Sequence, residues 1–129
     1  MALIRKYKDL IVYQKAFKVA MDIFILSRTF PIEERYSLTD QIRRSSRSVC
    51  GNLVEAWRKR RYEKMFVSKI VDSEGEASET QNWLDFAYAC GYMELSDYNK
   101  LTSDYEEVLM MLAKMSIDSK KWTFNPKEK

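Results

Sequence analysis

One stretch of the sequence concentrates side chains that could bind an anion. Between residues 41 and 61, seven basic residues stand against a single acid, Glu55, which gives this stretch a net charge of +6. Guanidinium groups bind phosphate oxygens through paired hydrogen bonds, and each neutralised phosphate releases counterions. Six of the seven bases are arginine, which suits an RNA backbone or another structured anionic partner. The candidate nucleic-acid-binding residues are Arg43, Arg44, Arg47, Arg58, Lys59, Arg60 and Arg61.

A second interpretation of this basic stretch is purely structural. Residues 63 to 107 hold eleven acids against three bases, a net charge of −8. The bases could therefore form a solvated helix face, or pair with these acids within one subunit or between subunits. Trp57, immediately before the Arg58–Arg61 run, also has two interpretations: it could stack on an unpaired nucleobase or anchor a protein interface.

A polar stripe is also expected on the same segment. Its members recur at spacings of three and four residues, so they share one face of a helix. Such a face could bind a ligand, or form a hydrogen-bonded network between helices or subunits. The network is favoured because no second catalytic cluster converges on it. The stripe consists of Gln41, Arg44, Ser48, Asn52 and Glu55.

Catalytic chemistry is poorly represented in the sequence. The absence of histidine excludes Ser–His and Cys–His pairs and most zinc sites. Three carboxylates share one helix face and could hold a metal only if another helix added ligands: Asp72, Glu76 and Glu79. The two cysteines, Cys50 and Cys90, suit reduced core or interface positions. We therefore expect no enzyme activity, no metal and no cofactor.

The elements that must position these residues are helices. Three glycines and two prolines in 129 residues are too few for an all-β fold of this length. Apolar residues recur with helical period over about residues 9–28, 38–61, 63–90 and from behind Ser96 to about residue 118. Short connections between long helices predict an antiparallel up-down four-helix bundle in a single domain, residues 1–117. Residues 118–129 lack a period, which predicts a flexible, extended or disordered C-terminal tail.

The sequence also predicts details of the helices. Asp9 and Ser96 are expected to cap the first and fourth helices at their N-termini, and Gly91 to end the third. Gly51 and Gly75 lie inside helices and suggest close approach of a neighbouring helix. The stripe expected to face the core from the first helix is Leu10, Tyr13, Phe17, Ala20 and Phe24, flanked by Val12, Val19, Ile23 and Leu26.

The N-terminal ten residues are basic but lead into no uninterrupted apolar run. Lys15, Lys18 and Asp22 break the hydrophobic stretch that follows. Neither a signal peptide nor a membrane span fits, so a cytoplasmic protein is expected.

Six stretches form a recognisable combination: Asp9–Ala16 (DLIVYQKA), Phe30–Ser46 (FPIEERYSLTDQIRRSS), Ser48–Val49, Asn52–Glu55 (NLVE), Glu76–Gln81 (EASETQ) and Cys90–Met93 (CGYM). The combination resembles the small bacterial four-helix-bundle proteins encoded within intervening sequences of 23S ribosomal RNA genes. It covers about residues 7 to 117. Many members have Glu-Gly where this chain has Glu55-Ala56, and the chain resembles a subgroup that is richer in basic residues there.

The resemblance implies an up-down bundle, a barrel-like homopentamer and a link to ribosomal RNA. A more distant relative, the accessory protein of diversity-generating retroelements, partners a reverse transcriptase. The resemblance supplies no catalytic residues. Residues and resemblance together predict a non-catalytic protein that binds structured ribosomal RNA. The alternative is an oligomeric scaffold that docks a protein such as a reverse transcriptase or a ribosome-associated factor.

Overall fold

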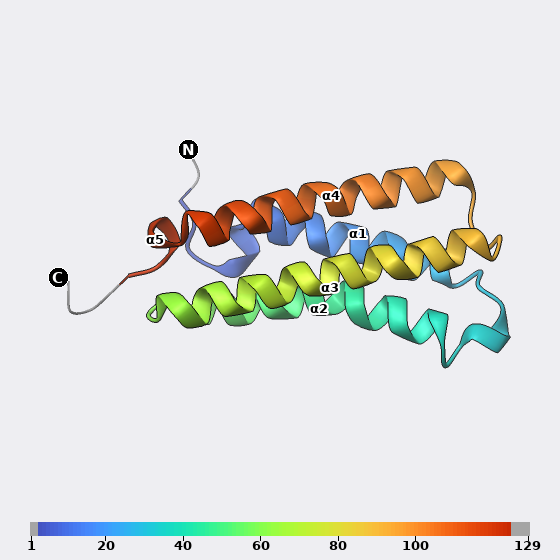
Figure 1. Ribbon diagram of the computed structural model, residues 1–129, viewed down its shortest axis with the longest axis horizontal. Helices are drawn as coiled ribbons and strands as arrows, with labels where there is room; N and C mark the ends of the chain where they lie inside the picture. Colours follow the sequence, from blue (N-terminus) through green and yellow to red (C-terminus); the bar gives the residue numbers. More distant parts are fainter. Residues whose placement is uncertain (1–2, 125–129) are drawn as a thin grey trace.

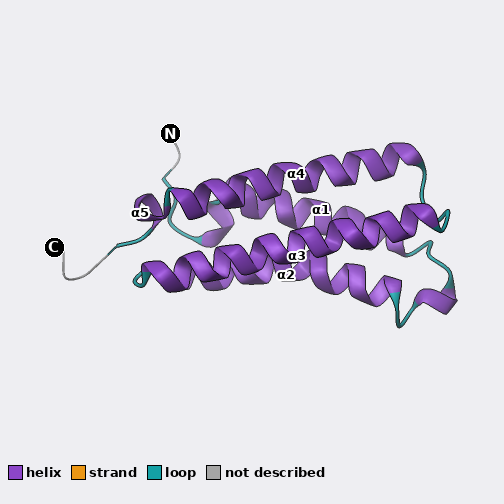
Figure 2. Cartoon of the chain, in the orientation of Figure 1, coloured by secondary structure: helices purple, strands orange, loops and turns teal. Residues whose placement is uncertain are grey.

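A computed structural model of the chain describes residues 3–124 and confirms the all-helical four-helix bundle. The long helices are α1 (Ile11–Ser27), α2 (Leu38–Arg58), α3 (Glu63–Ala89) and α4 (Leu95–Ile117). Helices adjacent in sequence run in opposite directions (Figure 1). Two 3₁₀ helices, η1 (Tyr7–Asp9) and η2 (Ile32–Glu34), precede α1 and α2, and a short helix, α5 (Ser119–Trp122), follows α4. The described residues contain no strand (Figure 2).

In three of the four segments predicted from helical period, one stripe with that period is buried. In α2 it runs from Leu38 to Ala56, in α3 from Phe66 to Ala87 and in α4 from Leu101 to Met115. Neighbouring members of each stripe are three or four residues apart, so their side chains lie on one helix face. The bundle core lies where these faces meet, because α1 and α3 each pack against both α2 and α4.

The stripe predicted for α1 is partly wrong. Its buried residues are Val12, Ala16, Val19, Ala20, Ile23 and Ser27, whereas Phe17 is 51% exposed. Apolar side chains surround α1, so its period fits more than one face. The face with smaller side chains is the one that packs against α2 and α4.

Small polar side chains join α2 to α3 inside the core. Thr80 Oγ1 lies 2.8 Å from Ser45 Oγ and also 2.8 Å from the carbonyl of Glu76. Ser73 Oγ donates a 2.8 Å hydrogen bond to the carbonyl of Val49. Ser45, Ser73 and Thr80 are each at most 2% exposed. Their small volume brings the helices together, and the hydrogen bonds offset the cost of burying hydroxyl groups.

The two predicted N-caps are wrong, and the predicted C-terminal glycine is confirmed. Leu10 occupies the N-cap position of α1, while the Asp9 carboxylate accepts hydrogen bonds from the Arg5 and Lys6 amides in the preceding turn. Helix α4 begins at Leu95, before Ser96. Gly91 has φ +80°, a left-handed conformation that ends α3 at little cost for glycine.

The glycines inside α2 and α3 do not mediate close packing within this chain. A Cβ atom added at Gly51 or Gly75 would meet no heavy atom within 4 Å among the described residues. Both positions are exposed, and the close contact between α2 and α3 is made by buried small residues instead.

The start of the predicted C-terminal tail is helical rather than extended or disordered. In α5, Ser119 Oγ donates a 2.7 Å hydrogen bond to Glu63 at the start of α3. The Phe124 amide donates a 3.1 Å bond to the carbonyl of Arg60. These contacts dock residues 119–124 on the end of the bundle, while the rest of the predicted tail, 125–129, lies outside the described residues.

Replacing Thr80 by valine tests the α2–α3 hydrogen bonds. Thr80→Val keeps the side-chain shape but removes the hydroxyl, so the free energy of unfolding should fall by about 1 to 2 kcal/mol in urea denaturation. Ser78→Ala is the matched control on the exposed face of α3 and should change it by less than about 0.5 kcal/mol. Equal stability of the two variants would contradict a structural role for the buried pair.

The two cysteines should differ sharply in reactivity. Cys50 is 9% exposed, and burial raises the pKa of its thiol to about 11, whereas Cys90 is exposed. Because the thiolate is the reacting form, a colorimetric thiol reagent at pH 8 should modify only Cys90 quickly in the folded protein. Both thiols should react after denaturation. The Cys90→Ser variant should show almost no fast reaction, and a fast phase in that variant would contradict the burial of Cys50.

Candidate nucleic-acid interface

The seven predicted bases form two clusters at opposite ends of α2. Arg43, Arg44 and Arg47 lie in its first half, and Arg58–Arg61 at its end and in the following turn. At a rise of 1.5 Å per residue, about 22 Å separates Arg43 from Arg58 along the helix axis. The sequence grouped these bases as one surface, but the structure does not bring them together.

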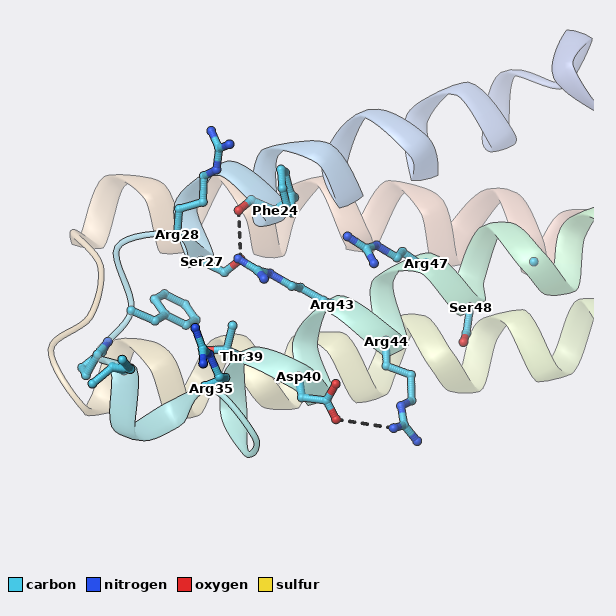
Figure 3. Close-up of a pocket in the computed structure, with 14 residues that line it drawn as sticks. Phe24, Ser27, Arg28, Arg35, Thr39, Asp40, Arg43, Arg44, Arg47 and Ser48 are labelled. Carbon is cyan, nitrogen blue, oxygen red and sulfur yellow. Dashed lines mark hydrogen bonds and ion pairs between the residues drawn. The ribbon is translucent and has the colours of Figure 1, made fainter.

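The first cluster lines an open cleft of about 1020 Å³ between the end of α1, the η2 segment and the first half of α2 (Figure 3). We call it the α1–α2 arginine cleft. It adds Arg28 and Arg35, which the sequence prediction missed, to the three bases of α2. The five arginines that line it are Arg28, Arg35, Arg43, Arg44 and Arg47.

Arg43 is held in place from α1. Its Nε donates a 2.7 Å hydrogen bond to Ser27 Oγ, and the Ser27 hydroxyl lies 2.9 Å from the carbonyl of Phe24. Ser27 is only 2% exposed, so this anchor is fixed by the packing of α1. Figure 3 shows the Arg43 side chain reaching from α2 toward the end of α1.

The Phe24 ring lies close to the guanidinium groups of three of the arginines. The guanidinium carbons of Arg28, Arg43 and Arg47 lie 5.1, 4.9 and 5.7 Å from its centroid. Attraction between cations and the ring face stabilises this arrangement.

The cleft retains most of its positive charge. Asp40, the one acidic side chain that lines it, lies 3.4 Å from Arg44 of the next turn. The other four arginines make no ion pair within residues 3–124. Nearby, Glu34 accepts hydrogen bonds from Ser37 at 2.6 Å and Tyr92 at 2.8 Å, and these bonds lower the pKa of its carboxyl group. Four uncompensated cations around one hollow attract anions.

The second cluster contains one base with a structural role. The Arg60 guanidinium lies 3.4 Å from the centroid of the Trp57 ring, and Arg60 Nε donates a 2.7 Å bond to the Trp57 carbonyl. Burial, followed by the nearby charge of Arg58, lowers the pKa of Arg60. Trp57 itself is 7% exposed. Its ring is therefore covered, and stacking on an unpaired nucleobase does not fit this geometry.

The predicted polar stripe does not form one network in the described chain. Asn52 Nδ2 donates to the Ser48 carbonyl, and Glu55 pairs with Lys69 of α3 at 3.2 Å. Arg44 pairs with Asp40 on its own helix, and Gln41 makes no side-chain hydrogen bond with residues 3–124. The stripe thus contributes one ion pair between α2 and α3, through Glu55.

The acidic face of α3 does not line the arginine cleft, although the charge of one cleft arginine, Arg44, reaches Glu76. Asp72, Glu76 and Glu79 line a groove of about 480 Å³ with Asn52, and burial and the two neighbouring carboxylates raise the pKa of Glu76. In the part of the chain that the structure describes, no group of three or more metal-binding side chains is close enough to hold a metal ion. No helix there is long and apolar enough to cross a membrane.

Comparison with known proteins identifies the family that has this architecture. A family model described as "23S rRNA-intervening sequence protein" matches residues 8–114. The chain belongs to this family. The result confirms the resemblance drawn from the sequence.

The residues matched by the model of the 23S rRNA-intervening sequence protein family span all of α2 and the turn after it, so both basic clusters lie within the matched region. A similar solved structure is a protein of unknown function from the S23 ribosomal protein family of Bacteroides thetaiotaomicron. The two share 25% sequence identity and a TM-score of 0.74 over 82% of this chain and 95% of that one. No curated protein matches the sequence.

The role of Arg60 can be separated from that of its neighbours. Arg60→Ala should lower the free energy of unfolding by about 1 to 2 kcal/mol, because it removes the contact with Trp57 and a hydrogen bond to a carbonyl. Arg61→Ala, at an exposed position, should lower it by less than about 0.5 kcal/mol. Urea denaturation followed by circular dichroism measures both. A larger loss for Arg61→Ala would contradict the assignment.

Proposed function

We propose that this member of the 23S rRNA-intervening sequence protein family associates with structured ribosomal RNA in the cytoplasm and catalyses no reaction. The observation that carries the proposal is the pair of separated basic clusters, one at the end of α2 and one in the α1–α2 arginine cleft, where four arginines have no ion-pair partner in residues 3–124. The description of the family names the 23S ribosomal RNA intervening sequence, which makes ribosomal RNA the natural class of ligand.

Phosphate contacts provide the binding energy in this proposal. The predicted bases Arg43, Arg44, Arg47, Arg58, Lys59, Arg60 and Arg61 occupy two clusters that the helix holds at a fixed separation. A folded RNA presents phosphates on several strands, so two separated clusters can engage two parts of its backbone. Such binding depends on RNA shape and charge rather than on base sequence.

An oligomeric protein scaffold is the second candidate function. It is favoured by apolar side chains exposed along α1, among them Ile11 at 61%, Phe17 at 51% and Ile25 at 58%. Exposed apolar patches mark protein contacts more often than RNA contacts. In this view the chain assembles into the homopentamer implied by the family resemblance and docks a protein such as a reverse transcriptase or a ribosome-associated factor. A pull-down that survives nuclease treatment and depends on Phe17 would favour the scaffold.

RNA binding is tested by fluorescence anisotropy with a structured ribosomal RNA fragment and a DNA duplex of equal length. The protein should prefer the RNA, and its affinity should fall steeply between low and near-physiological salt. Changing Arg58, Lys59 and Arg61 together to alanine should weaken RNA binding at least about tenfold and reduce the salt slope by about two. This variant keeps Arg60, so the packing of Trp57 is preserved.

The matched control removes the same charge elsewhere, by changing the exposed lysines Lys8, Lys18 and Lys114 to alanine. It should keep most of the affinity of the unmodified protein. Absent binding, salt-independent binding, or equal loss in the two triple variants would contradict the proposal.

A further inference from the structure

We infer that the α1–α2 arginine cleft binds a compact, multiply charged phosphate group, such as the 5′ phosphate end of an RNA chain or the diphosphate of a free nucleotide. The identification of an RNA end as the source of this phosphate group rests on the function proposed above. The second basic cluster, at the end of α2, plays no part in this site.

The charge of the cleft fits a group with more than one negative charge. Arg28, Arg35, Arg43 and Arg47 remain without an acidic partner among the described residues, since Asp40 pairs with Arg44. A phosphodiester in an RNA backbone carries one negative charge, whereas a terminal phosphate carries about 1.5 to 2 at neutral pH, and a diphosphate carries more. The terminal group therefore neutralises the four arginines better than one backbone phosphate.

The arginines that line the cleft come from three elements rather than from one helix face. Arg28 comes from the turn after α1, Arg35 from the turn after η2, and Arg43 and Arg47 from consecutive turns of α2. Figure 3 shows Arg43 and Arg47 extending from α2 toward α1, Arg28 extending from the end of α1 away from α2, and Arg44 pointing away with Asp40. A backbone-tracking surface would spread its bases along a line. This cleft gathers them from three elements around one hollow.

The contacts of the Phe24 ring indicate that the ligand group is a phosphate and not a base. Three guanidinium groups already lie within 6 Å of the centroid of this ring, so a nucleobase would have to displace them to stack on it. The planar guanidinium groups can instead donate paired hydrogen bonds to phosphate oxygens.

The cleft also keeps hydrogen-bond donors free for such a ligand. Ser27 engages only Nε of Arg43, which leaves the terminal nitrogens without a partner in residues 3–124. The Thr39 and Ser48 hydroxyls line the same cleft and make no hydrogen bond with the described residues. Because Arg43 is already held in place, binding costs less side-chain entropy.

The test compares three RNAs of one sequence that carry a 5′ triphosphate, a 5′ monophosphate or a 5′ hydroxyl group, with free pyrophosphate as a competitor. The triphosphate RNA should bind about tenfold or more tightly than the hydroxyl RNA, with the monophosphate between them. Pyrophosphate should remove this difference. Arg47→Gln and Arg43→Gln should each abolish the preference, and Lys114→Ala should preserve it.

Arg47→Gln is the more decisive variant, because Arg47 makes no hydrogen bond within residues 3–124 and its loss should leave the fold intact. Circular dichroism melting verifies this. The triple variant at Arg58, Lys59 and Arg61 should weaken all three RNAs alike, because it acts on the other cluster.

The possible results separate this inference from the proposed function. Equal affinity for the three RNAs, unaffected by pyrophosphate, would overturn the inference and leave RNA association standing. Saturable pyrophosphate binding that Arg47→Gln abolishes, without binding of any RNA, would support the site with a free nucleotide as the source and would overturn RNA association. Failure to bind either pyrophosphate or RNA would overturn both.

Discussion

The hydrogen-bonded contact between α2 and α3 is the constraint on which the rest of the structure depends. Thr80 Oγ1 and Ser45 Oγ lie 2.8 Å apart, and Ser73 Oγ bonds to the Val49 carbonyl, all inside the core. A buried hydroxyl loses free energy if its partner moves away, so these bonds favour one rotation of α2 about its axis. Once that rotation is set, Arg43 and Arg47 face the end of α1, and the acids of α3 lie on another side of the molecule. The cationic cleft thus follows from polar packing in the core.

The antiparallel return from α1 to α2 completes the cleft. Phe30-Pro31 ends the first helix, because the residue before proline is pushed out of the helical region, and η2 carries the chain back toward the bundle. The turn brings Arg28 and Arg35 beside bases that follow them in sequence. Ser27 then holds Arg43 by a 2.7 Å bond across the two helices. The charge of the site therefore comes from both α2 and the connection, and the connection also sets its shape.

The sequence was sufficient for the core of three helices and insufficient where several faces of a helix look alike. In α2, α3 and α4 polar residues flank one apolar stripe, so the period identifies the buried face. In α1 apolar residues lie all round, and large aromatics such as Phe17 drew the prediction to a face that is exposed. The seven bases of α2 and the turn after it were found from composition, but their division into two clusters depends on helix length. The addition of Arg28 and Arg35 depends on the turn between α1 and α2. Asp9 and Ser96 have good capping side chains, yet Leu10 and Glu94 occupy the N-cap positions of α1 and α4, so residue type alone did not locate either helix start.

The repulsion between the arginines of the cleft indicates that the cleft serves to bind a ligand rather than to stabilise the fold. Placing Arg28, Arg35, Arg43 and Arg47 around one hollow costs free energy through like-charge repulsion. Asp40 pairs with Arg44, and Glu34, although its hydrogen bonds from Ser37 and Tyr92 favour the ionised form, makes no ion pair with these four arginines among the described residues. The acids of α3 are numerous and none of them pairs with these arginines among the described residues. A fold that buries its apolar stripes in one core and yet leaves four cations together conforms to the general rule that local conflicts gather at functional sites. An anion in the cleft relieves the repulsion, so the same charges that weaken the unliganded bundle supply the binding energy.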